Sequence, residues 1–328
     1  MLRPDFGDVT SEYLALRSGR AYVSDFSEIV WVTGEEAITF LNGQASQDVA
    51  GMVAGTTARS FLLEPRGKLV DLLWLLRGED RVGLVTGAGR GTGVIEHLDG
   101  FRFRVDVGLT LDDRPVIEVW GSDLSAVAGK AGLSRGSGWV DSKGVTVALL
   151  VGQPLGRLLL AGFDADGLKS LGLTPAGRVA ADAVRVEACE PVMGVDVDET
   201  TIPQESGLVA ESVSFTKGCY VGQELVARID SRGRVNRRLA GVSMATNVVP
   251  PPGSEVLSGG VIVGSVSTVG QSLAMRAPIG LAMIHRGVEY GSEVTIRWES
   301  GSTTARVHDL PLDDFSGISH SSYIQDRE

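Results

Sequence analysis

The chain has 328 residues, enough for two or three domains at roughly 100–200 residues each. Hydrophobic residues make up 43% and charged residues 22%, which is typical of a globular protein and excludes a low-complexity chain. Acidic residues outnumber basic ones by 41 to 30, for a net charge of −11. General nucleic-acid binding is therefore disfavoured, because it needs a basic surface.

Membrane and metal classes are also disfavoured. No run of about 18 apolar residues occurs, and the N-terminal segment lacks the basic start and apolar stretch of a signal peptide. We therefore expect a cytoplasmic protein without a membrane partner. Two cysteines, Cys189 and Cys219, are too few for a disulfide framework, and the four histidines lack ligand spacing. The sequence predicts no metal site.

Patterns in the first half predict an α+β unit. Thr33 and Glu36 have the spacing of a capping box and Gly43 is a typical helix stop, so a helix is expected near 34–42. Strands and helices then alternate in an order typical of an antiparallel sheet covered on one face. The expected strands lie near 60–63, 69–77, 81–86 and 101–105, and the expected helices near 92–99 and 123–131.

The second half changes from mixed to all-β character. Apolar patterns predict a strand pair in 145–161 and a helix in 176–186. Four short apolar runs separated by Pro and Gly turns then predict a small antiparallel β barrel or sandwich. These runs are 239–244, 261–269, 279–284 and 294–298. Residues 313–328 are polar and are expected to form a loosely held tail.

A glycine cluster at residues 87–93 follows an apolar run and invites a dinucleotide-binding interpretation. Thr92 stands where the third glycine of GxGxxG belongs, so the cluster is interpreted as a plain turn. No GxxxxGK[ST] sequence occurs either. Phosphate binding at a glycine-rich loop is disfavoured.

The segment Lys217–Glu224, KGCYVGQE, holds the densest set of reactive residues. The residues after it fit a helix beginning near Tyr220 or Val221, so Cys219 is expected at a helix N-terminus. The helix dipole and Lys217 would stabilise a thiolate there and make Cys219 more acidic than a free thiol. The alternative is an inert buried cysteine. Two glycines beside Lys, Cys and Tyr make poor core residues, which favours a functional thiol.

Five arginines follow within eleven residues: Arg228, Arg232, Arg234, Arg237 and Arg238. They form either a solvated face or a local anion site, since guanidinium groups pair bidentately with carboxylate or phosphate. Nucleic acid is a conceivable ligand for this patch.

Glu187 closes a helical pattern, Arg185-Val186-Glu187, that leads into a polar loop. The simpler interpretation is a surface helix end. A carboxylate facing a pocket can instead accept two hydrogen bonds from the edge of an amino-pyrimidine ring.

Taken together, these motifs resemble the YgfZ branch of the glycine-cleavage T-protein (aminomethyltransferase) superfamily, over residues 30 to 300. KGCYVGQE is the specific match; the supporting matches are 40–44 with Asp48, 65–68, and 185–187 with Pro191, Gly194, Asp196 and Pro203. The resemblance implies an α+β fold: a three-domain ring around a tetrahydrofolate pocket. Its expected parts are a discontinuous folate-binding domain (1–52 plus 145–236), a ferredoxin-like domain (53–144), a C-terminal antiparallel β barrel (237–312) and the tail.

The resemblance also implies a function. It predicts an accessory protein that binds tetrahydrofolate, or a one-carbon or polyglutamylated derivative of it. This protein would support the assembly or repair of iron-sulfur client enzymes and, through them, tRNA modification. Glu187 matches the glutamate that holds the pterin ring, and Asp71 falls near the aspartate beside the folate nitrogens. Cys219, with Lys217 and Tyr220, matches the hallmark of the branch. Cys189 departs from a family glycine, which raises the possibility of a second thiol near the pocket.

Two rival functions stay open. One is a folate-dependent one-carbon transferase or demethylase, in which Asp71 is the acid/base. The other is a binding module without folate that uses the arginines for RNA or a partner protein. In the folate interpretation, Arg228, Arg232 and Arg234 bind the anionic glutamate tail.

Overall fold

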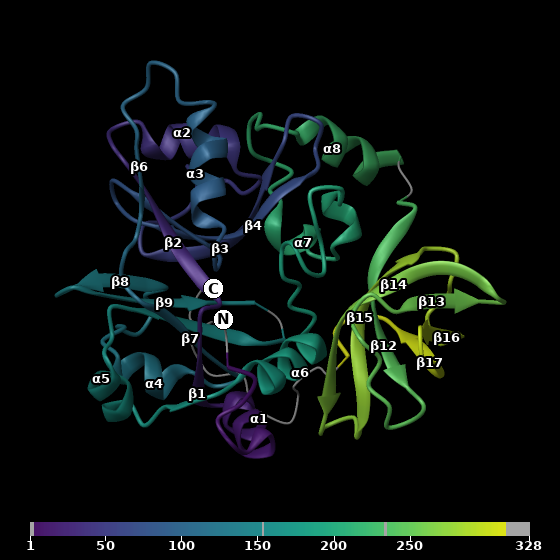
Figure 1. Ribbon diagram of the computed structural model, residues 1–328. Coiled ribbons are helices and arrows are strands. Elements are labelled where there is room, and N and C mark those ends of the chain that lie inside the picture. The colour runs from purple at the N-terminus through teal and green to yellow at the C-terminus, as the bar shows by residue number, and fades with distance from the viewer. Residues whose placement is uncertain (1–2, 153, 233–234, 313–328) are drawn as a thin grey trace.

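Two β-sheets and a closed β-barrel make up the structure, a computed structural model that describes residues 3–152, 154–232 and 235–312. The two sheets lie one above the other on one side of the molecule and the barrel lies on the other side (Figure 1). In the described ranges, no helix is long and apolar enough to cross a membrane.

The five-stranded sheet is antiparallel throughout, with the order β3-β4-β5-β2-β6. Its strands are β2 (Ser27–Thr33), β3 (Thr56–Leu63), β4 (Leu69–Arg77), β5 (Val82–Gly87) and β6 (Gly108–Leu111). Side-chain alternation directs Leu62, Leu73 and Leu75 to one face. Helices α2 (Ala37–Gln44) and α3 (Gly91–Asp99) cover that face.

The six-stranded sheet has the order β11-β1-β7-β10-β9-β8. Its strands are β1 (Ser18–Ser24), β7 (Val116–Gly121), β8 (Trp139–Ser142), β9 (Val145–Leu150), β10 (Gly156–Ala161) and β11 (Thr174–Pro175). Its helices are α1 (Val9–Arg17), α4 (Ser125–Lys130), α5 (Ala165–Ser170) and α6 (Arg178–Ala188). Helices α1 and α6 share one apolar core with β1, and α4 and α5 share another with β7, β9 and β10.

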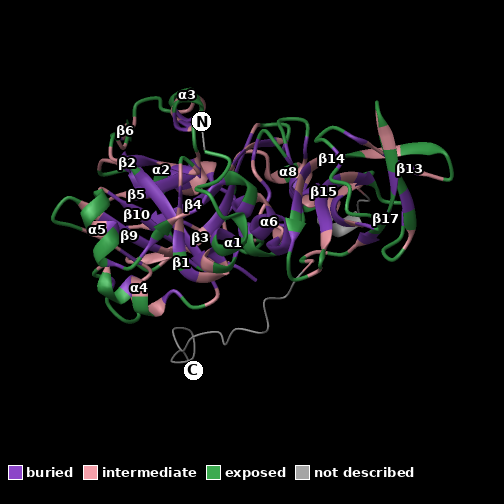
Figure 2. Ribbon diagram, turned by 60° about the horizontal axis from the view of Figure 1, so that its bottom comes forward, coloured by how far each residue is buried: buried purple, intermediate pink, exposed green. Residues whose placement is uncertain are grey.

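The two sheets pack face to face through a common apolar core. Trp31 and Trp74 from the five-stranded sheet contact Trp139, Leu150 and Leu159 from the six-stranded sheet. Figure 2 shows the strands as mostly buried, whereas the helices at the periphery are largely exposed.

The barrel is closed by six antiparallel strands in the order β12-β15-β14-β13-β16-β17. They are β12 (Arg237–Met244), β13 (Glu255–Ser258), β14 (Val261–Ser272), β15 (Ala277–His285), β16 (Glu293–Trp298) and β17 (Gly301–His308). The predicted C-terminal antiparallel barrel is confirmed. It packs against α6 so closely that a Cβ on Gly270 would lie 2.7 Å from the Cα of Ala183.

Three short helices connect the sheets to the barrel: η1 (Pro203–Glu205), α7 (Val209–Ser212) and α8 (Gln223–Arg232). Leu208, Val213 and Val226 from this region pack on Phe61 and Leu69 of the five-stranded sheet. The segment that carries KGCYVGQE therefore lies on that sheet.

Strand pairing crosses two boundaries expected from the sequence. β2, expected in the first unit, pairs with β5 and β6, whereas β7 and β8, expected in the middle unit, pair with β1, β9 and β10. Pairing of distant strands depends on tertiary packing, which local apolar patterns do not encode.

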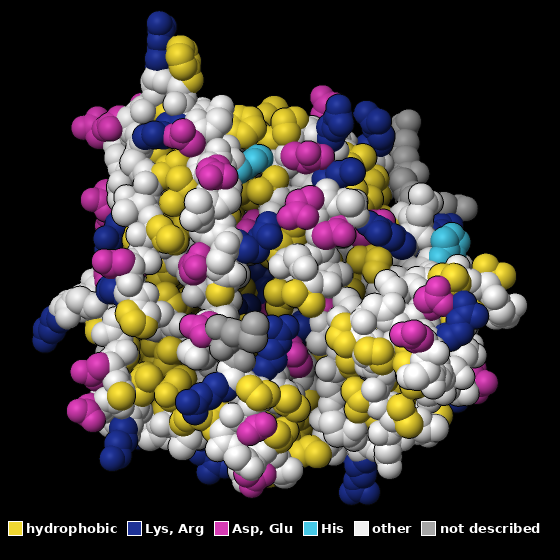
Figure 3. Space-filling model, viewed as in Figure 1, with side chains coloured by type: hydrophobic (Ala, Val, Ile, Leu, Met, Phe, Trp, Pro, Cys, Tyr) yellow, Lys and Arg dark blue, Asp and Glu magenta, His cyan; other side chains and the backbone are white. Residues whose placement is uncertain are grey.

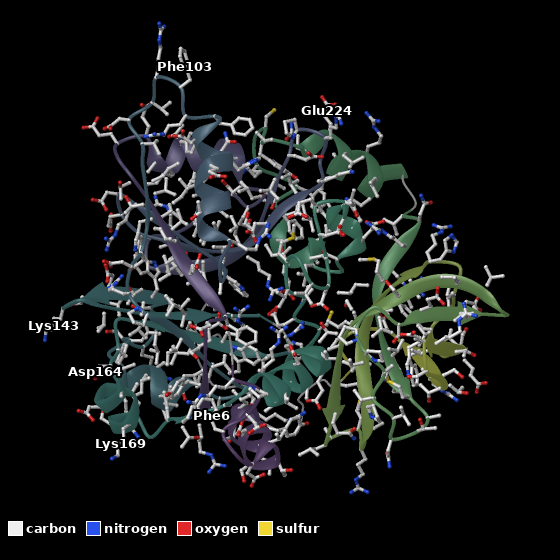
Figure 4. The ribbon with its side chains drawn as sticks, in the orientation of Figure 1. Phe6, Phe103, Lys143, Asp164, Lys169 and Glu224 are labelled. Atoms are coloured by element: carbon white, nitrogen blue, oxygen red, sulfur yellow. The ribbon has the colours of Figure 1, made fainter. Side chains whose placement is uncertain are left out.

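Two local predictions are wrong. Residues 101–105 form turns, not a strand, and Phe103 lies 76% exposed on a projecting loop (Figure 4). The helix after Thr33 begins at Ala37 without a capping box, because Glu36 accepts a hydrogen bond from the backbone N–H of Asp106 at 2.7 Å.

Candidate functional site

Lys217 joins two sequence motifs that are far apart in the chain. Its Nζ donates to the carbonyl oxygens of Asn42, Ala45 and Gln47, at 2.7, 2.8 and 2.8 Å. These carbonyls lie at and after the C-terminal end of α2, where unpaired acceptors favour a cation. Lys217 therefore fixes KGCYVGQE to the segment around 40–47.

A pair of glycines brings a third motif, the turn at residues 65–68, into contact with the KGCYVGQE segment. Gly67 and Gly222 both have φ +80°, which favours glycine. A Cβ on Gly67 would lie 2.6 Å from the Cβ of Leu225, and one on Gly222 would lie 2.7 Å from the carbonyl oxygen of Glu64. The turn at 65–68 and the KGCYVGQE segment thus fit together only without side chains at these positions.

Cys219 lies in this segment and is exposed. Helix α8 begins at Gln223, four residues later, so the prediction that Cys219 occupies a helix N-terminus is wrong. The turn at Tyr220–Gly222 intervenes, and the backbone N–H of Tyr220 donates to Gln223 Oε1 at 3.3 Å. Glu224, the last residue of the segment, lies at the outer edge of the molecule (Figure 4).

Lys217 and Tyr220 are half-buried beside each other. Burial lowers the pKa of Lys217 to about 8, against the opposing effect of Asp48, and burial raises the pKa of Tyr220 to about 12. The Lys217 Nζ lies 5.1 Å from the centre of the Tyr220 ring. The contacts of Lys217 are those of a residue that holds the segment in place.

Replacing Lys217 with Met should destabilise the fold by about 2 kcal/mol, because three carbonyl oxygens lose a charged donor. Urea unfolding measures the loss. Lys169→Met, at an exposed site on α5 (Figure 4), is the matched control and should change the free energy of unfolding by less than about 0.5 kcal/mol. Equal stability of the two variants would contradict the role assigned to Lys217.

Cys189, the second thiol, ends α6 in a left-handed conformation with φ +56°. Glycine is the usual residue at such a helix end, which agrees with the glycine that the family resemblance leads one to expect. Its side chain packs beside Leu239 and Ile279 of the barrel, and burial raises the pKa of its thiol.

The two thiols should differ in reactivity. Iodoacetamide should label Cys219 at least about tenfold faster than Cys189, because thiolate is the nucleophile and burial suppresses it at Cys189. Mass spectrometry of the native protein at short reaction times measures both rates. Comparable labelling before unfolding would contradict the burial of Cys189.

A cavity of about 70 Å³, partly open to solvent, lies between the two sheets and the loop after α6. Lys and Arg side chains gather near the middle of the face shown in Figure 3, where the parts of the molecule meet. The aromatic residues that line the cavity are Phe26, Phe61, Trp74 and Trp120. Its charged lining residues are Arg59, Asp71, Arg157, Arg185 and Glu190.

Strand register explains part of this lining. Arg59 pairs with Trp74, and Phe61 pairs with Leu72, across β3 and β4. Directly paired residues share a face, and all four line the cavity. The opposite face of these strands carries the apolar residues that pack against α2 and α3.

Asp71 contributes to the cavity lining and is 1% exposed, and its role as an acid/base stays a prediction. Its Oδ2 accepts hydrogen bonds from Thr86 Oγ1 at 2.8 Å and Arg90 Nε at 2.9 Å. Burial raises its pKa above the ordinary aspartate value, although Arg90 opposes the shift. A carboxyl group of this kind exchanges a proton more readily near neutral pH than an ordinary aspartate does.

A chain of alternating charges that sequence reasoning missed runs along the other wall. Glu118 binds Arg157, Arg157 lies 3.8 Å from Glu190, Glu190 binds Arg59, and Arg59 lies 3.6 Å from Glu211. The sequence feature that could have indicated this chain of charges is a charged residue within an apolar strand. Glu118 stands in VIEVW and Arg157 in GRLLL. Such positions are buried, so each charge needs a partner.

Glu187 is not among the cavity residues. It is fully buried where α1, α6 and β14 meet, and it accepts hydrogen bonds from Tyr13 at 2.6 Å, Arg17 at 2.6 Å and Ser272 at 2.5 Å. Burial raises the pKa of its carboxyl group against the effect of these partners. These contacts connect α6 to α1 and the barrel.

The five arginines have different surroundings. Arg237 binds Glu205 at 3.0 Å, and Arg238 donates to the carbonyl oxygens of Arg286 and Val288. Arg228 is exposed on α8. The side chain of Arg232 and all of Arg234 lie outside the described residues. For the parts of the chain that are described, no group of three or more His, Cys, Asp or Glu side chains is placed to hold a metal ion.

Known proteins resemble the chain over most of its length. Residues 237–314 match the family model of the glycine cleavage T-protein C-terminal barrel domain. An aminomethyltransferase from Thermus thermophilus is 29% identical over 90% of this chain and 88% of its own length. One from Symbiobacterium thermophilum is 28% identical over 94% and 90%, and one from a Nostoc species is 26% identical over 85% and 80%.

A solved structure has the same fold. The crystal structure of glycine cleavage system aminomethyltransferase T from Bartonella henselae superposes with a TM-score of 0.83 at 22% identity, over 93% of this chain and 90% of that chain. The predicted fold class, with its C-terminal antiparallel barrel, is confirmed. These relatives are named aminomethyltransferases, so placement in the YgfZ branch stays a prediction. By sequence, the chain is similar to aminomethyltransferases over most of its length, and its C-terminal barrel matches the barrel domain of the glycine cleavage T-protein.

Proposed function

We propose that the chain binds tetrahydrofolate in the central cavity and takes part in one-carbon transfer. The observation that carries this proposal is the aromatic-lined cavity with the buried Asp71 in its wall. Relatives named aminomethyltransferase, aligned over most of both chains, support it. This proposal corresponds to the folate-dependent one-carbon transferase, which is one of the two rival functions that the sequence left open.

The residues present fit a folate. Ligand sites are mostly apolar with a few polar groups, and the lining of this cavity has that composition. Trp74, Trp120 and Phe61 offer flat apolar surfaces to a ring system. Asp71 and the Arg59–Glu190 pair supply polar groups at the walls.

Bound tetrahydrofolate would supply the nitrogen that accepts a one-carbon unit. Asp71 would hold or move a proton at its carboxyl group, in which Oδ1 accepts from the backbone N–H of Leu72 at 2.7 Å and Oδ2 accepts from Thr86 and Arg90. The apolar walls would exclude water from the ligand, which strengthens the electrostatic effect of Asp71.

Titration with 5-formyltetrahydrofolate tests the binding. Trp74 and Trp120 line the cavity, so ligand binding should change the tryptophan fluorescence. Saturable binding that calorimetry confirms is the expected result. Absence of binding by both methods would overturn the proposed function.

The thiol at Cys219 favours a second candidate function, support of iron-sulfur enzymes in the manner of the YgfZ branch. Cys219 is exposed on a segment that Lys217 and Gly222 hold in place, as a reactive group would require. Cys219→Ser should then reduce iron-sulfur enzyme activity in cells while folate affinity stays unchanged. Cys189→Ser is the control. Full complementation by Cys219→Ser would remove this candidate.

Two further folate contacts stay predictions. Glu187 could bind the pterin ring only by exchanging Tyr13, Arg17 or Ser272 for the ligand. The predicted binding of a polyglutamate tail by Arg228, Arg232 and Arg234 calls for comparison of mono- and polyglutamylated folate at two salt concentrations. A preference for the longer tail that shrinks with salt would support it.

A further inference from the structure

The glycine-rich turn at residues 87–93, which the proposed function does not use, holds a carboxylate of the chain itself. Glu28 of β2 accepts hydrogen bonds from the backbone N–H of Gly89, at 2.8 Å to Oε1, and of Gly91, at 2.9 Å to Oε2. Helix α3 begins at Gly91, and the unpaired N–H groups of a helix start favour a negative charge. Glu28 therefore takes the place that an anion has in a phosphate-binding loop.

The fit around Glu28 requires glycine at one position of the turn. A Cβ on Gly91 would lie 2.8 Å from Glu28 Oε2 and 2.5 Å from Leu111 Cδ1. A Cβ on Gly93, two residues later in the same helix, would make no such contact within 4 Å. Glu28 thus fixes the turn through a close approach that a side chain at position 91 would disturb.

Arg90 lies between the two glycines that Glu28 holds, and it reaches Asp71 from outside the cavity. Its Nε donates to Asp71 Oδ2 at 2.9 Å, and its Nη2 donates to the carbonyl oxygen of Val70 at 2.8 Å. Arg90 is not one of the residues that line the cavity. Its effect on a bound ligand therefore passes through Asp71.

The other guanidinium groups of the cavity lining are paired with other carboxylates. Arg59 binds Glu190, Arg157 binds Glu118, and Arg185 binds Asp196. In the described part of the chain, Arg90 is the cation paired with Asp71, and Glu199 lies 3.4 Å from Arg90 on its exposed side. The charge of Arg90 opposes the rise that burial causes in the pKa of Asp71. The acidity of Asp71 therefore depends on where this guanidinium lies.

We propose that Glu28 is a positioning residue, which holds the glycine-rich turn so that Arg90 stays on Asp71 and controls its proton exchange. The consequence for turnover rests on the function proposed above, whereas the positioning itself does not. The glycine-rich turn, although it resembles a phosphate-binding loop, then serves to place a cation beside the buried carboxyl group.

Carbon-13 NMR of protein labelled at its aspartate carboxyl groups tests the positioning without turnover. The Asp71 signal is the one that Asp71→Asn removes. Arg90→Gln should raise the titration midpoint of Asp71 by about 1–3 pH units, because an opposite charge this close lowers a carboxyl pKa by that amount. Glu28→Gln should raise it by about 0.5 unit or more, because its amide NH₂ cannot accept from the second backbone N–H and the turn loosens.

Gly91→Ala and Gly93→Ala are the matched pair, since only the first places a Cβ against Glu28. Gly91→Ala should raise the midpoint as Glu28→Gln does, whereas Gly93→Ala should titrate like the wild type. The pH dependence of turnover should move with the midpoint in every variant.

The outcomes separate the positioning from the proposed function. A folded Glu28→Gln variant with an unchanged Asp71 midpoint would overturn the positioning and leave the proposed function standing. A wild type without turnover, in which the Asp71 midpoint still responds to Glu28→Gln, would overturn the proposed function and leave the positioning standing.

Discussion

Asp71→Asn should lower the turnover of one-carbon transfer by about 10²–10⁴-fold while folate affinity changes little, because the amide keeps the shape but cannot exchange a proton. The relevant assay follows 5,10-methylenetetrahydrofolate formed from an aminomethyl donor. Burial raises the pKa of Asp71, so wild-type turnover should rise with pH as the carboxyl group ionises into the base. The variant should lack this rise.

Glu199→Gln is the control for this experiment. Glu199 also contacts Arg90, at 3.4 Å, but its side chain is 67% exposed and is not part of the cavity lining. This substitution removes a negative charge next to Arg90 but keeps the buried carboxyl group of Asp71. Turnover in Glu199→Gln should match the wild type. If the two variants lose turnover equally, Asp71 acts only by holding Arg90.

Glu118→Ala should destabilise the fold by about 3–5 kcal/mol, because it leaves Arg157 without its principal partner in a buried site. Glu118 is fully buried and also accepts hydrogen bonds from Ser27 and from Trp120 Nε1, the latter at 2.6 Å. Urea unfolding of both proteins at neutral pH measures the difference.

The Glu118 carboxyl group should also make the stability of the fold depend on pH in the acidic range. Burial by itself raises the pKa of Glu118, but Arg157 and the hydrogen bonds lower it overall, below the ordinary value of 4.5. A carboxyl group with a lowered folded-state pKa stabilises the fold above its unfolded pKa and loses this effect as pH falls. Wild-type stability should therefore drop below about pH 4.5 more steeply than that of the variant.

The double variant Glu118→Leu with Arg157→Met is the informative control. Replacing a buried ion pair by apolar residues of similar size is often neutral or stabilising. Its stability should therefore lie well above that of Glu118→Ala. A double variant as unstable as the single one would assign the loss to packing rather than to an unpaired charge.

Local patterns predicted most elements because apolar periodicity is a local property. The strands near 69–77 and 279–284 and the helix in 176–186 all have counterparts in β4, β15 and α6. The failure at 101–105 has a local cause: Phe103 alternates with polar residues as a strand would, yet it faces solvent. The prediction of which unit each strand joins was wrong for β2 and β7, because β2 pairs with β5 and β7 pairs with β1, and both partners are distant in sequence.

The candidate site was only partly predictable. The family resemblance pointed to Asp71, which contributes to the cavity lining, and its role in a site stays a prediction. Arg59 and Glu190 belong to no motif, and their ion pair joins residues 131 positions apart in the sequence, so only the folded structure shows it. Lys217 was noted as a charge near Cys219, but its three carbonyl contacts depend on the ends of elements distant in sequence.

The bond from Lys217 to Asn42 spans 175 residues of sequence, and this separation has a consequence for synthesis. At roughly 5–20 residues per second, Lys217 is added to the growing chain about 9–35 s after Asn42. During that interval the carbonyl oxygens of Asn42, Ala45 and Gln47 must bind water. The surroundings of Cys219 therefore cannot be completed until this segment is synthesised, after all strands of the five-stranded sheet have been made.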